Sequence, residues 1–263
     1  MLSFFKPDWS APPNIVALST QISGGVSQGE YKGLNLAMHV GDDAASVTRN
    51  REMLEQFLNK QYGDIAPITW LNQTHSSNAI YLRAKHQAHL AQSDTHNNLL
   101  NADAALCAEV GLPCTVMTAD CLPVFICDKQ ATTVAMIHAG WRGLAKGILQ
   151  ATLTQMNVPP SQLCAAFGPA ICHACYQVKR SDMQMFAHID GALRADNAQG
   201  KAKLDLKAIA KHQLHMAGVH DISCESPCTY CSSEYYSHRR ATHQNQTNTG
   251  RIANLILIKP SSN

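Results

Sequence analysis

Apolar residues in this sequence gather into short unbroken runs separated by polar and glycine-containing turns. Runs of this length, rich in β-branched residues, are typical of strands buried on both faces. We predict strands at residues 14–20, 115–117, 123–127, 132–137, 163–167 and 252–258, and a half-buried strand at residues 33–43. Strands are therefore expected from near the N-terminus to the end of the chain.

Other stretches place apolar side chains close to helical spacing. Residues 42–60 do so, and Asp42 or Asp43 would cap the resulting helix. We predict further helices at residues 144–156, 181–189 and 206–217, a polar loop at residues 195–203, and a short helix running into a surface loop within residues 85–101.

Helices and strands mix along the whole chain, and the sequence contains no internal repeat, low-complexity tract or linker. Such mixing is typical of sheets that bury their faces against helices. We therefore predict a single α+β domain over residues 1–263, with mixed sheets packed between helices.

The composition is that of a globular protein with balanced charge. The chain has 263 residues and a formal net charge of +2, too small an excess to indicate a nucleic-acid or membrane partner. The first residues lack the basic segment and long apolar run of a signal peptide. Ten cysteines in such a chain favour reduced thiols over a disulfide framework, so we expect a cytoplasmic protein.

Three side chains at the edges of apolar runs form the candidate chemical centre. Cys121 precedes the run at 123–127, His138 follows the run at 132–137, and His75 follows the apolar residues 68–71. Two imidazoles and a thiolate suit zinc, and copper less selectively. Three protein ligands would leave a fourth position open for water or substrate.

The same residues admit other interpretations, because the three positions are far apart in sequence. Cys121 would also serve as the nucleophile of a cysteine hydrolase, with a histidine as its base. A closed metal site in a metal-storing or partner-binding protein is a further interpretation. The simplest one is a buried thiol and two hydrogen-bonded histidines.

Several arginines are candidates for binding a phosphate or carboxylate. Arg142 lies in a glycine-flanked segment, residues 140–143, that opens a predicted helix, and Lys146 follows it. Arg51, Arg239 and Arg240 are further candidates. For each of them a structural role is the alternative.

Two Cys-x-x-Cys pairs complete the set of notable residues. Cys172/Cys175 and Cys228/Cys231 would together be able to form a four-cysteine zinc site or a redox pair, although ordinary thiols are the favoured interpretation. A multicopper oxidase requires closely spaced His-x-His pairs, and the sequence contains none.

An ordered set of motifs resembles a known family. The motifs are Asn-Gln-Thr-His at 72–75, Thr-Ala-Asp-Cys-Leu-Pro at 118–123, His-Ala-Gly-Trp-Arg-Gly at 138–143 and Gly-Pro-Ala-Ile at 168–171. Together with shorter matches from Gly24 to Arg251, they resemble the laccase-domain (YfiH-like, "polyphenol oxidase") family of purine nucleoside-cleaving enzymes. The resemblance implies a layered α/β/β/α fold.

The resemblance also implies an activity. It implies a zinc enzyme, with copper as the alternative metal, that has His75, Cys121 and His138 as metal ligands and catalytic residues. The implied reactions are phosphorolysis of adenosine, inosine and guanosine, cleavage of methylthioadenosine, and deamination of adenosine. An older label for the family is copper-dependent polyphenol oxidase.

Substrate contacts follow from the same resemblance. We expect a purine nucleoside and phosphate as the small-molecule partners, Arg51, Arg142 and Arg239 as their contacts, and a monomer or homodimer. The chain departs from the family pattern at Ile22, where an arginine is common, and at Gln177, where a glutamate is common. The competing hypothesis remains a cysteine hydrolase that acts through Cys121 on a small amide or a cell-wall precursor.

Overall fold

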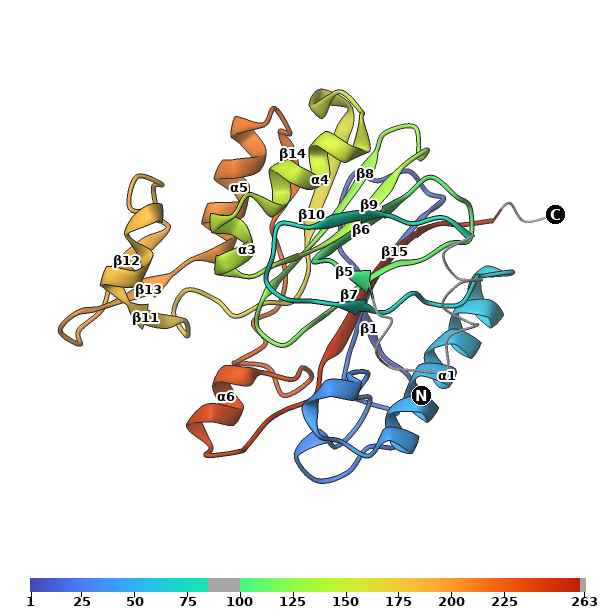
Figure 1. Ribbon diagram of the computed structural model, residues 1–263, viewed down its shortest axis with the longest axis horizontal. Helices are drawn as coiled ribbons and strands as arrows, with labels where there is room; N and C mark the ends of the chain where they lie inside the picture. The colour runs from blue at the N-terminus through green and yellow to red at the C-terminus, as the bar shows by residue number, and fades with distance from the viewer. Residues whose placement is uncertain (85–99, 261–263) are drawn as a thin grey trace.

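Two β-sheets form the centre of the computed structural model, which describes residues 1–84 and 100–260 (Figure 1). The four-stranded sheet has the order β1 (Phe4–Phe5), β2 (Ile15–Thr20), β15 (Ile252–Ile258), β7 (Cys114–Thr118). The six-stranded sheet has the order β14 (Asp221–Ser223), β10 (Leu163–Phe167), β8 (Leu122–Asp128), β9 (Val134–Ala139), β6 (Ala104–Cys107), β4 (Ala79–Tyr81). Parallel pairing of β10 with β14 and of β4 with β6 makes this second sheet mixed.

The central strands are buried on both faces, as their unbroken apolar runs predict. In β8, Val124 and Ile126 pack toward the helices, while Phe125 and Cys127 pack toward the other sheet. Successive side chains of a strand point to opposite faces, so a strand between two apolar layers needs apolar residues at every position.

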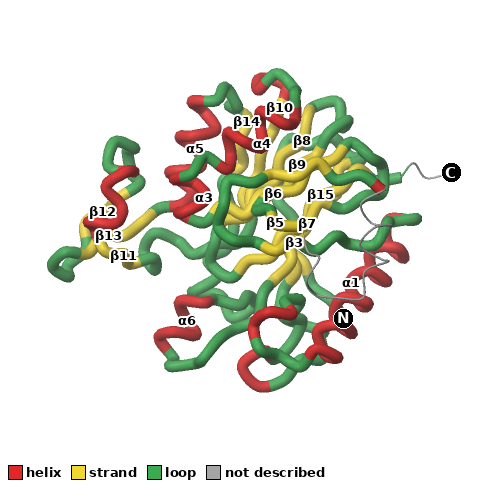
Figure 2. The backbone as a smooth tube through the Cα atoms, viewed as in Figure 1, coloured by secondary structure: helices red, strands yellow, loops and turns green. Residues whose placement is uncertain are grey.

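Helices cover the outer faces of the two sheets (Figures 1 and 2). Helix α1 (Ala44–Tyr62) packs Leu54 and Leu58 against Leu255 and Leu257 of the four-stranded sheet. The other face is covered by α3 (Trp141–Ala145), α4 (Ile148–Met156) and α5 (Leu206–Met216). The layers therefore run helix, sheet, sheet, helix, and the predicted α/β/β/α arrangement is confirmed.

Smaller elements lie at the rim. The parallel pair of β3 (Leu71–Asn72) and β5 (Leu100–Asn101) lies beside the sheets, and α6 (His238–His243) precedes β15. A three-stranded sheet, of order β11 (Gln177–Lys179), β13 (Lys201–Leu204), β12 (Leu193–Ala195), stands away from the layers on the left of Figure 1. In the described part of the chain, no helix combines the length and apolarity needed to cross a membrane.

The prediction of a strand at residues 33–43 is wrong. These residues form an irregular segment that ends in the short 3-10 helix Met38–Val40. The Asn35 side chain accepts a hydrogen bond from Ala37 N (3.1 Å) and donates to Asp42 Oδ2 (2.9 Å). Local side-chain bonds of this kind compete with a strand ladder, although Leu34, Leu36 and Val40 are still buried.

Two helix predictions need correction, and a third cannot be compared. The helix at 144–156 is divided into α3 and α4 at Gly147, whose φ of 81° is left-handed and favours glycine. Residues 181–189 contain a 3-10 helix, Arg180–Phe186, in which the buried Met183 and Phe186 are three positions apart, one turn of such a helix. Most of the segment predicted at 85–101 lies outside the described residues.

The remaining predictions hold more closely. Helix α1 begins after Asp43, whose carboxylate accepts a hydrogen bond from Ser46 N (2.9 Å), so Asp43 is the cap. The helix at 206–217 is α5. The polar stretch at 195–203 is not a free loop, because it joins β12 to β13 in a hairpin.

Candidate functional site

The three candidate metal ligands come together at one end of the six-stranded sheet. His75 lies in the connection between β3 and β4, Cys121 immediately precedes β8, and His138 lies in β9. Strands β8 and β9 are neighbours, and Pro123 pairs with His138 across the ladder. Strand pairing therefore accounts for the approach of Cys121 to His138.

The distances among the three candidate ligands suit a metal ion with tetrahedral coordination. The ligand atoms of His75, Cys121 and His138 all lie within 4.8 Å of one another, and His75 Nε2 is 3.8 Å from Cys121 Sγ. Zinc bonds of ordinary length to nitrogen and sulfur place two such ligand atoms about 3.6 Å apart. The three side chains therefore fit a zinc ion without rearrangement of the fold.

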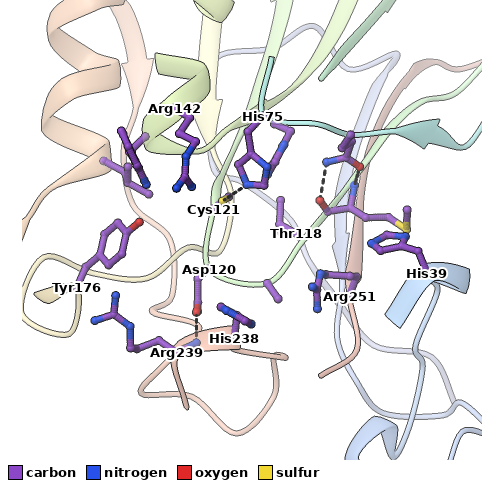
Figure 3. A pocket seen from close by; sticks show the side chains of 16 residues that line it. His39, His75, Thr118, Asp120, Cys121, Arg142, Tyr176, His238, Arg239 and Arg251 are labelled. Atoms are coloured by element: carbon purple, nitrogen blue, oxygen red, sulfur yellow. Dashed lines mark hydrogen bonds between the residues drawn. The ribbon is translucent and has the colours of Figure 1, made fainter. Parts of the chain in front are cut away.

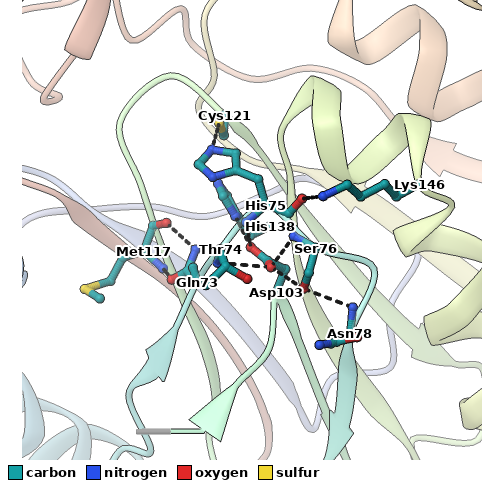
Figure 4. Close-up of polar contacts among 10 residues, drawn as sticks. All are labelled: Gln73, Thr74, His75, Ser76, Asn78, Asp103, Met117, Cys121, His138 and Lys146. Atoms are coloured by element: carbon teal, nitrogen blue, oxygen red, sulfur yellow. Dashed lines mark hydrogen bonds and ion pairs between the residues drawn. The ribbon is translucent and has the colours of Figure 1, made fainter. Parts of the chain in front are cut away.

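A buried carboxylate, which sequence reasoning missed, organises these ligands (Figure 4). Asp103 is fully buried, and its Oδ1 lies 2.8 Å from His138 Nδ1. A carboxylate at Nδ1 selects the tautomer that leaves Nε2 free, which is the usual orientation of a metal-binding histidine. The one signal in the sequence is an acidic residue directly before a short apolar run.

The same carboxylate holds the loop that carries His75. Asp103 accepts hydrogen bonds from Thr74 N (3.2 Å), His75 N (3.0 Å) and Ser76 N (2.6 Å). His75 has a φ of 55°, which is uncommon for a residue with a side chain. Three bonds from consecutive amides compensate for this conformation, so the position of His75 also depends on Asp103.

In the metal-free site, electrostatics favour a Cys121 thiolate, a protonated His138 and an ionised Asp103, so a metal at His138 Nε2 would replace a proton there. Burial alone would raise the pKa of Cys121, but the charges and hydrogen bonds of His138 and His75 outweigh it and lower the pKa to about 6. Burial likewise opposes the charge on His138, but Cys121 and Asp103 raise its pKa to about 9. Hydrogen bonds from His138 and Ser76 overcome burial at Asp103 and hold its pKa well below its usual value.

Gly140 provides the space for this centre. A Cβ atom at this position would lie 2.9 Å from Cys121 Sγ and 2.9 Å from His75 Cδ2. Real Cβ atoms do not approach so closely, so any other residue would displace one of the two ligands.

An open cavity of about 340 Å³ lies directly over the ligands (Figure 3). This volume falls at the lower end of the range for small-molecule sites, about 300–1,000 Å³. The cavity is lined by the three ligands and by His39, Gln73, Met117, Thr118, Ala119, Asp120, Trp141, Arg142, Tyr176, Leu206, His238, Arg239 and Arg251. A small molecule in the cavity would thus lie against the metal ligands themselves.

Two of the three predicted arginines, Arg142 and Arg239, line this cavity, and Arg251, which was not predicted, joins them. Arg239 Nη1 donates to Gln177 O (2.7 Å), and Arg251 Nη1 donates to Thr249 O (2.6 Å). Within the described ranges, the Arg142 guanidinium makes no hydrogen bond and only stacks on Trp141, 4.4 Å from the ring centroid. Arg142 therefore keeps its donors free for a ligand.

The other candidate cations are engaged elsewhere. Arg51 is not among the lining residues; its guanidinium stacks on Trp70 (4.1 Å), and its Nε donates to Leu36 O (2.9 Å). A substrate contact by Arg51 stays a prediction. Arg240 binds the carbonyl oxygens of the segment 229–235, which is a structural role. Lys146 Nζ donates to His75 O (3.2 Å).

Asp120, a neighbour of Cys121, does not orient a histidine. Its carboxylate accepts hydrogen bonds from Thr229 Oγ1 (2.7 Å) and Arg239 N (2.7 Å). Asp120, which lines the cavity, is thus hydrogen-bonded to the segment that carries Arg239. Gln177, one of the two departures from the family pattern, donates a hydrogen bond from its side-chain amide to Asp196 Oδ1 (3.2 Å).

Comparison with known proteins agrees with this fold and site. The family model described as multi-copper polyphenol oxidoreductase laccase matches residues 16–259, so the chain belongs to this laccase-domain family. All three ligands and the lining residues of the cavity lie within the matched range.

Several relatives are similar over almost their whole length. The chain is 35% identical to the purine nucleoside phosphorylase PA4543 of Pseudomonas aeruginosa, over 98% of this chain and 100% of that protein. It is 33% identical to the purine nucleoside phosphorylase YfiH of Escherichia coli, over 98% of this chain and 100% of that protein. The crystal structure of Neisseria meningitidis protein NMB0706 matches with a TM-score of 0.85 and 37% identity, over 98% of this chain and 99% of that protein.

Replacement of Asp103 tests its role at the metal site. In Asp103→Asn, the side chain would keep one oxygen acceptor, and its NH₂ group would face either the Nδ1–H of His138 or the amide N–H groups of the loop, all of which now donate to the carboxylate. We expect zinc affinity at this site to fall about 10–100-fold, the usual effect of removing such a partner. Competition with a chromophoric chelator measures the affinity.

The exposed Asp182, on the 3-10 helix Arg180–Phe186, supplies the control. Asp182→Asn should bind zinc as the unaltered chain does. An Asp103→Asn protein with unaltered zinc affinity would contradict the role given to Asp103.

Proposed function

We propose that this protein is a zinc-dependent purine nucleoside phosphorylase that also deaminates adenosine. Adenosine, inosine, guanosine and methylthioadenosine are the proposed nucleosides, and inorganic phosphate is the second substrate. The observation that carries the proposal is the set of two imidazoles and one thiolate with an open, arginine-lined cavity directly over it. The names of the similar bacterial proteins support the reaction class.

His75, Cys121 and His138 would hold the zinc, and Asp103 would keep His138 in the required tautomer. When bound, zinc supplies Lewis acidity: it activates water or polarises an oxygen atom of a ligand. Among the described residues only these three ligands gather at this site, so one coordination position would face the cavity. That open position argues against a closed, metal-storing site.

Arginine side chains would bind the phosphate. Phosphorolysis requires phosphate beside C1′ of the ribose, with its charge balanced by cations. Arg142 has unengaged donors at the cavity wall, and Arg239 and Arg251 add positive charge there. We propose Arg142 as the principal phosphate contact, because its planar guanidinium can donate two parallel hydrogen bonds.

Aromatic side chains would bind the nucleoside. Trp141 and Tyr176 line the cavity and offer flat apolar faces to a purine ring. Burial and the nearby Cys121 raise the pKa of Tyr176, so its hydroxyl stays protonated and would be able to donate a hydrogen bond to a bound nucleoside. Deamination at C6 would use the same cavity with water in place of phosphate.

Cysteine hydrolysis is the second candidate, because the lowered pKa of Cys121 also suits a nucleophile. A hydrolase base needs one histidine at the sulfur, whereas both His75 and His138 face it here. The presence of two histidines beside one thiolate therefore favours a metal site over a nucleophile with a single base. Copper-dependent polyphenol oxidation agrees with the family description, but the chain lacks His-x-His pairs for a copper cluster.

Removal of the thiolate ligand tests the proposed function. We expect Cys121→Ala to lose one equivalent of zinc per chain, and nucleoside cleavage to fall at least about 10³-fold, because catalytic groups that act as a unit fail together. Metal analysis and a panel of nucleosides assayed with and without phosphate provide the measurements. Inosine cleavage should require phosphate, and adenosine should also yield inosine.

The matched control is Cys224→Ala, a partly buried cysteine outside the cavity. It should keep both the zinc and the activity. Adenine release at the unaltered rate by metal-free Cys121→Ala would refute the proposal, whereas full activity after chelation together with a covalent adduct on Cys121 would establish the hydrolase.

Replacement of Arg142 tests the phosphate contact. Loss of a hydrogen bond to a charged ligand costs about 1.5–3 kcal/mol, so the KM for phosphate of Arg142→Ala should rise roughly 10–150-fold. Deamination of adenosine, which uses no phosphate, should change much less. Arg180→Ala, at an exposed position outside the cavity, serves as the control, and an unchanged KM in Arg142→Ala would contradict the contact.

A further inference from the structure

The two Cys-x-x-Cys pairs, which the proposed function does not use, meet in space. The sulfur atoms of Cys172, Cys175, Cys228 and Cys231 all lie within 4.8 Å of one another. They belong to two segments 56 positions apart in sequence. All ten cysteines of the chain are free thiols, so no covalent bond holds this four-cysteine cluster together.

The distances between the four sulfur atoms suit a metal ion with tetrahedral coordination. Zinc–sulfur bonds of about 2.3 Å place the sulfurs of a four-cysteine site about 3.8 Å apart. Cys175 Sγ lies 3.3 Å from Cys231 Sγ across the two pairs, and no two of the four sulfurs are more than 4.8 Å apart. Small rotations of the side chains would bring the four sulfurs to equal distances around one ion.

Backbone hydrogen bonds hold the two segments in register. Thr229 N donates to Ala170 O (3.1 Å), and Ala170 N donates to Pro227 O (3.2 Å), which forms a short parallel bridge beside the cluster. Each pair lies in a tight turn, closed by Tyr176 N to Cys172 O (3.1 Å) and by Ser232 N to Cys228 O (3.0 Å). The approach of the four sulfurs is thus built by the backbone.

One backbone amide already points at one of the four sulfurs. Cys228 Sγ accepts a hydrogen bond from the backbone N–H of Cys172 (3.3 Å). Hydrogen bonds of this kind stabilise thiolates, which are the form that binds a metal. A neutral thiol gains less from such a donor.

Cations adjoin the cluster and would offset its charge. Arg240 Nη1 donates to the carbonyl oxygens of Thr229 (2.7 Å) and Tyr230 (2.9 Å), the two residues between Cys228 and Cys231. Lys207 Nζ donates to Cys224 O (3.1 Å) and Ser226 O (3.0 Å), just before the second pair. Four thiolates around a divalent ion carry a charge of −2, which two neighbouring cations balance.

We propose that Cys172, Cys175, Cys228 and Cys231 bind a second zinc ion, in a four-thiolate structural site separate from the His75–Cys121–His138 centre. Each Cys-x-x-Cys turn contributes two ligands, and binding releases the thiol protons to solvent. With four protein ligands this site is closed, so its role is to join two segments of chain. The proposal does not depend on the proposed activity.

The two segments that the ion would join also form the cavity wall. Tyr176 follows Cys175 directly, and Thr229, which donates to Asp120, follows Cys228. Arg239 donates to Gln177 O (2.7 Å), two positions after Cys175. A metal at the four-cysteine cluster would therefore fix the wall opposite the catalytic ligands.

Metal analysis of the full chain tests the proposal. The protein is purified from zinc-supplemented cells without chelators, and zinc per chain is measured. We expect two zinc ions in the unaltered chain, one in Cys121→Ala, and one in the double variant C228S/C231S. Cys224→Ser, at a nearby cysteine outside the cluster, should keep two.

Spectroscopy of Cys121→Ala identifies the ligands without disturbing the cluster. When cobalt replaces the remaining zinc, the spectrum should show the intense thiolate-to-metal charge-transfer bands of a four-sulfur site, and X-ray absorption should show sulfur only around zinc. This result stands even if C228S/C231S does not fold. No zinc in Cys121→Ala, nitrogen or oxygen ligands around the zinc of Cys121→Ala, or a mass showing disulfides among the four cysteines would overturn the proposal.

Discussion

The candidate centre depends on one buried carboxylate. Asp103 bonds to His138 Nδ1 and to three consecutive amides of the loop that carries His75. A carboxylate taken out of water is costly unless its oxygens are fully hydrogen-bonded, and here they are. The same bonds that stabilise Asp103 therefore fix both histidines relative to Cys121.

This arrangement places the candidate metal ligands on rigid supports, whereas the cavity lining comes from several segments of the chain. His138 lies within a central strand and Cys121 precedes its neighbour, so two ligands are held by the β8–β9 ladder. The third ligand is on a loop, and Asp103 provides the rigidity that a strand would otherwise supply. Side chains from several segments then line the cavity, which would suit the binding of the proposed phosphate and purine base.

Most of the central strands could be predicted from the sequence, because buried strands carry unbroken apolar runs, whereas the order of the layers followed from the family resemblance. The segment at 33–43 could not, since the hydrogen bonds of Asn35 override its apolar pattern. The division of the helix at Gly147 likewise depends on a left-handed residue that periodicity does not reveal. The pattern of apolar residues predicts which positions are buried more reliably than it predicts the backbone conformation of those positions.

The site was predicted in part for similar reasons. Cys121 and His138 flank neighbouring runs, so strand pairing brings them together, and His75 likewise follows the apolar residues 68–71. Asp103 was missed because its contact with His138, 35 positions away, exists only after β6 pairs with β9. Arg142 is free at the cavity whereas Arg51 stacks on Trp70, and this difference is visible only in three dimensions.

The most direct test is a crystal structure of the zinc-loaded protein with anomalous data collected at the zinc edge. The account predicts a peak bonded to His75 Nε2, Cys121 Sγ and His138 Nε2, with Asp103 still on His138 Nδ1 and the fourth position facing the cavity. An ion bound through His138 Nδ1, or one at that centre closed by a fourth protein ligand, would contradict it.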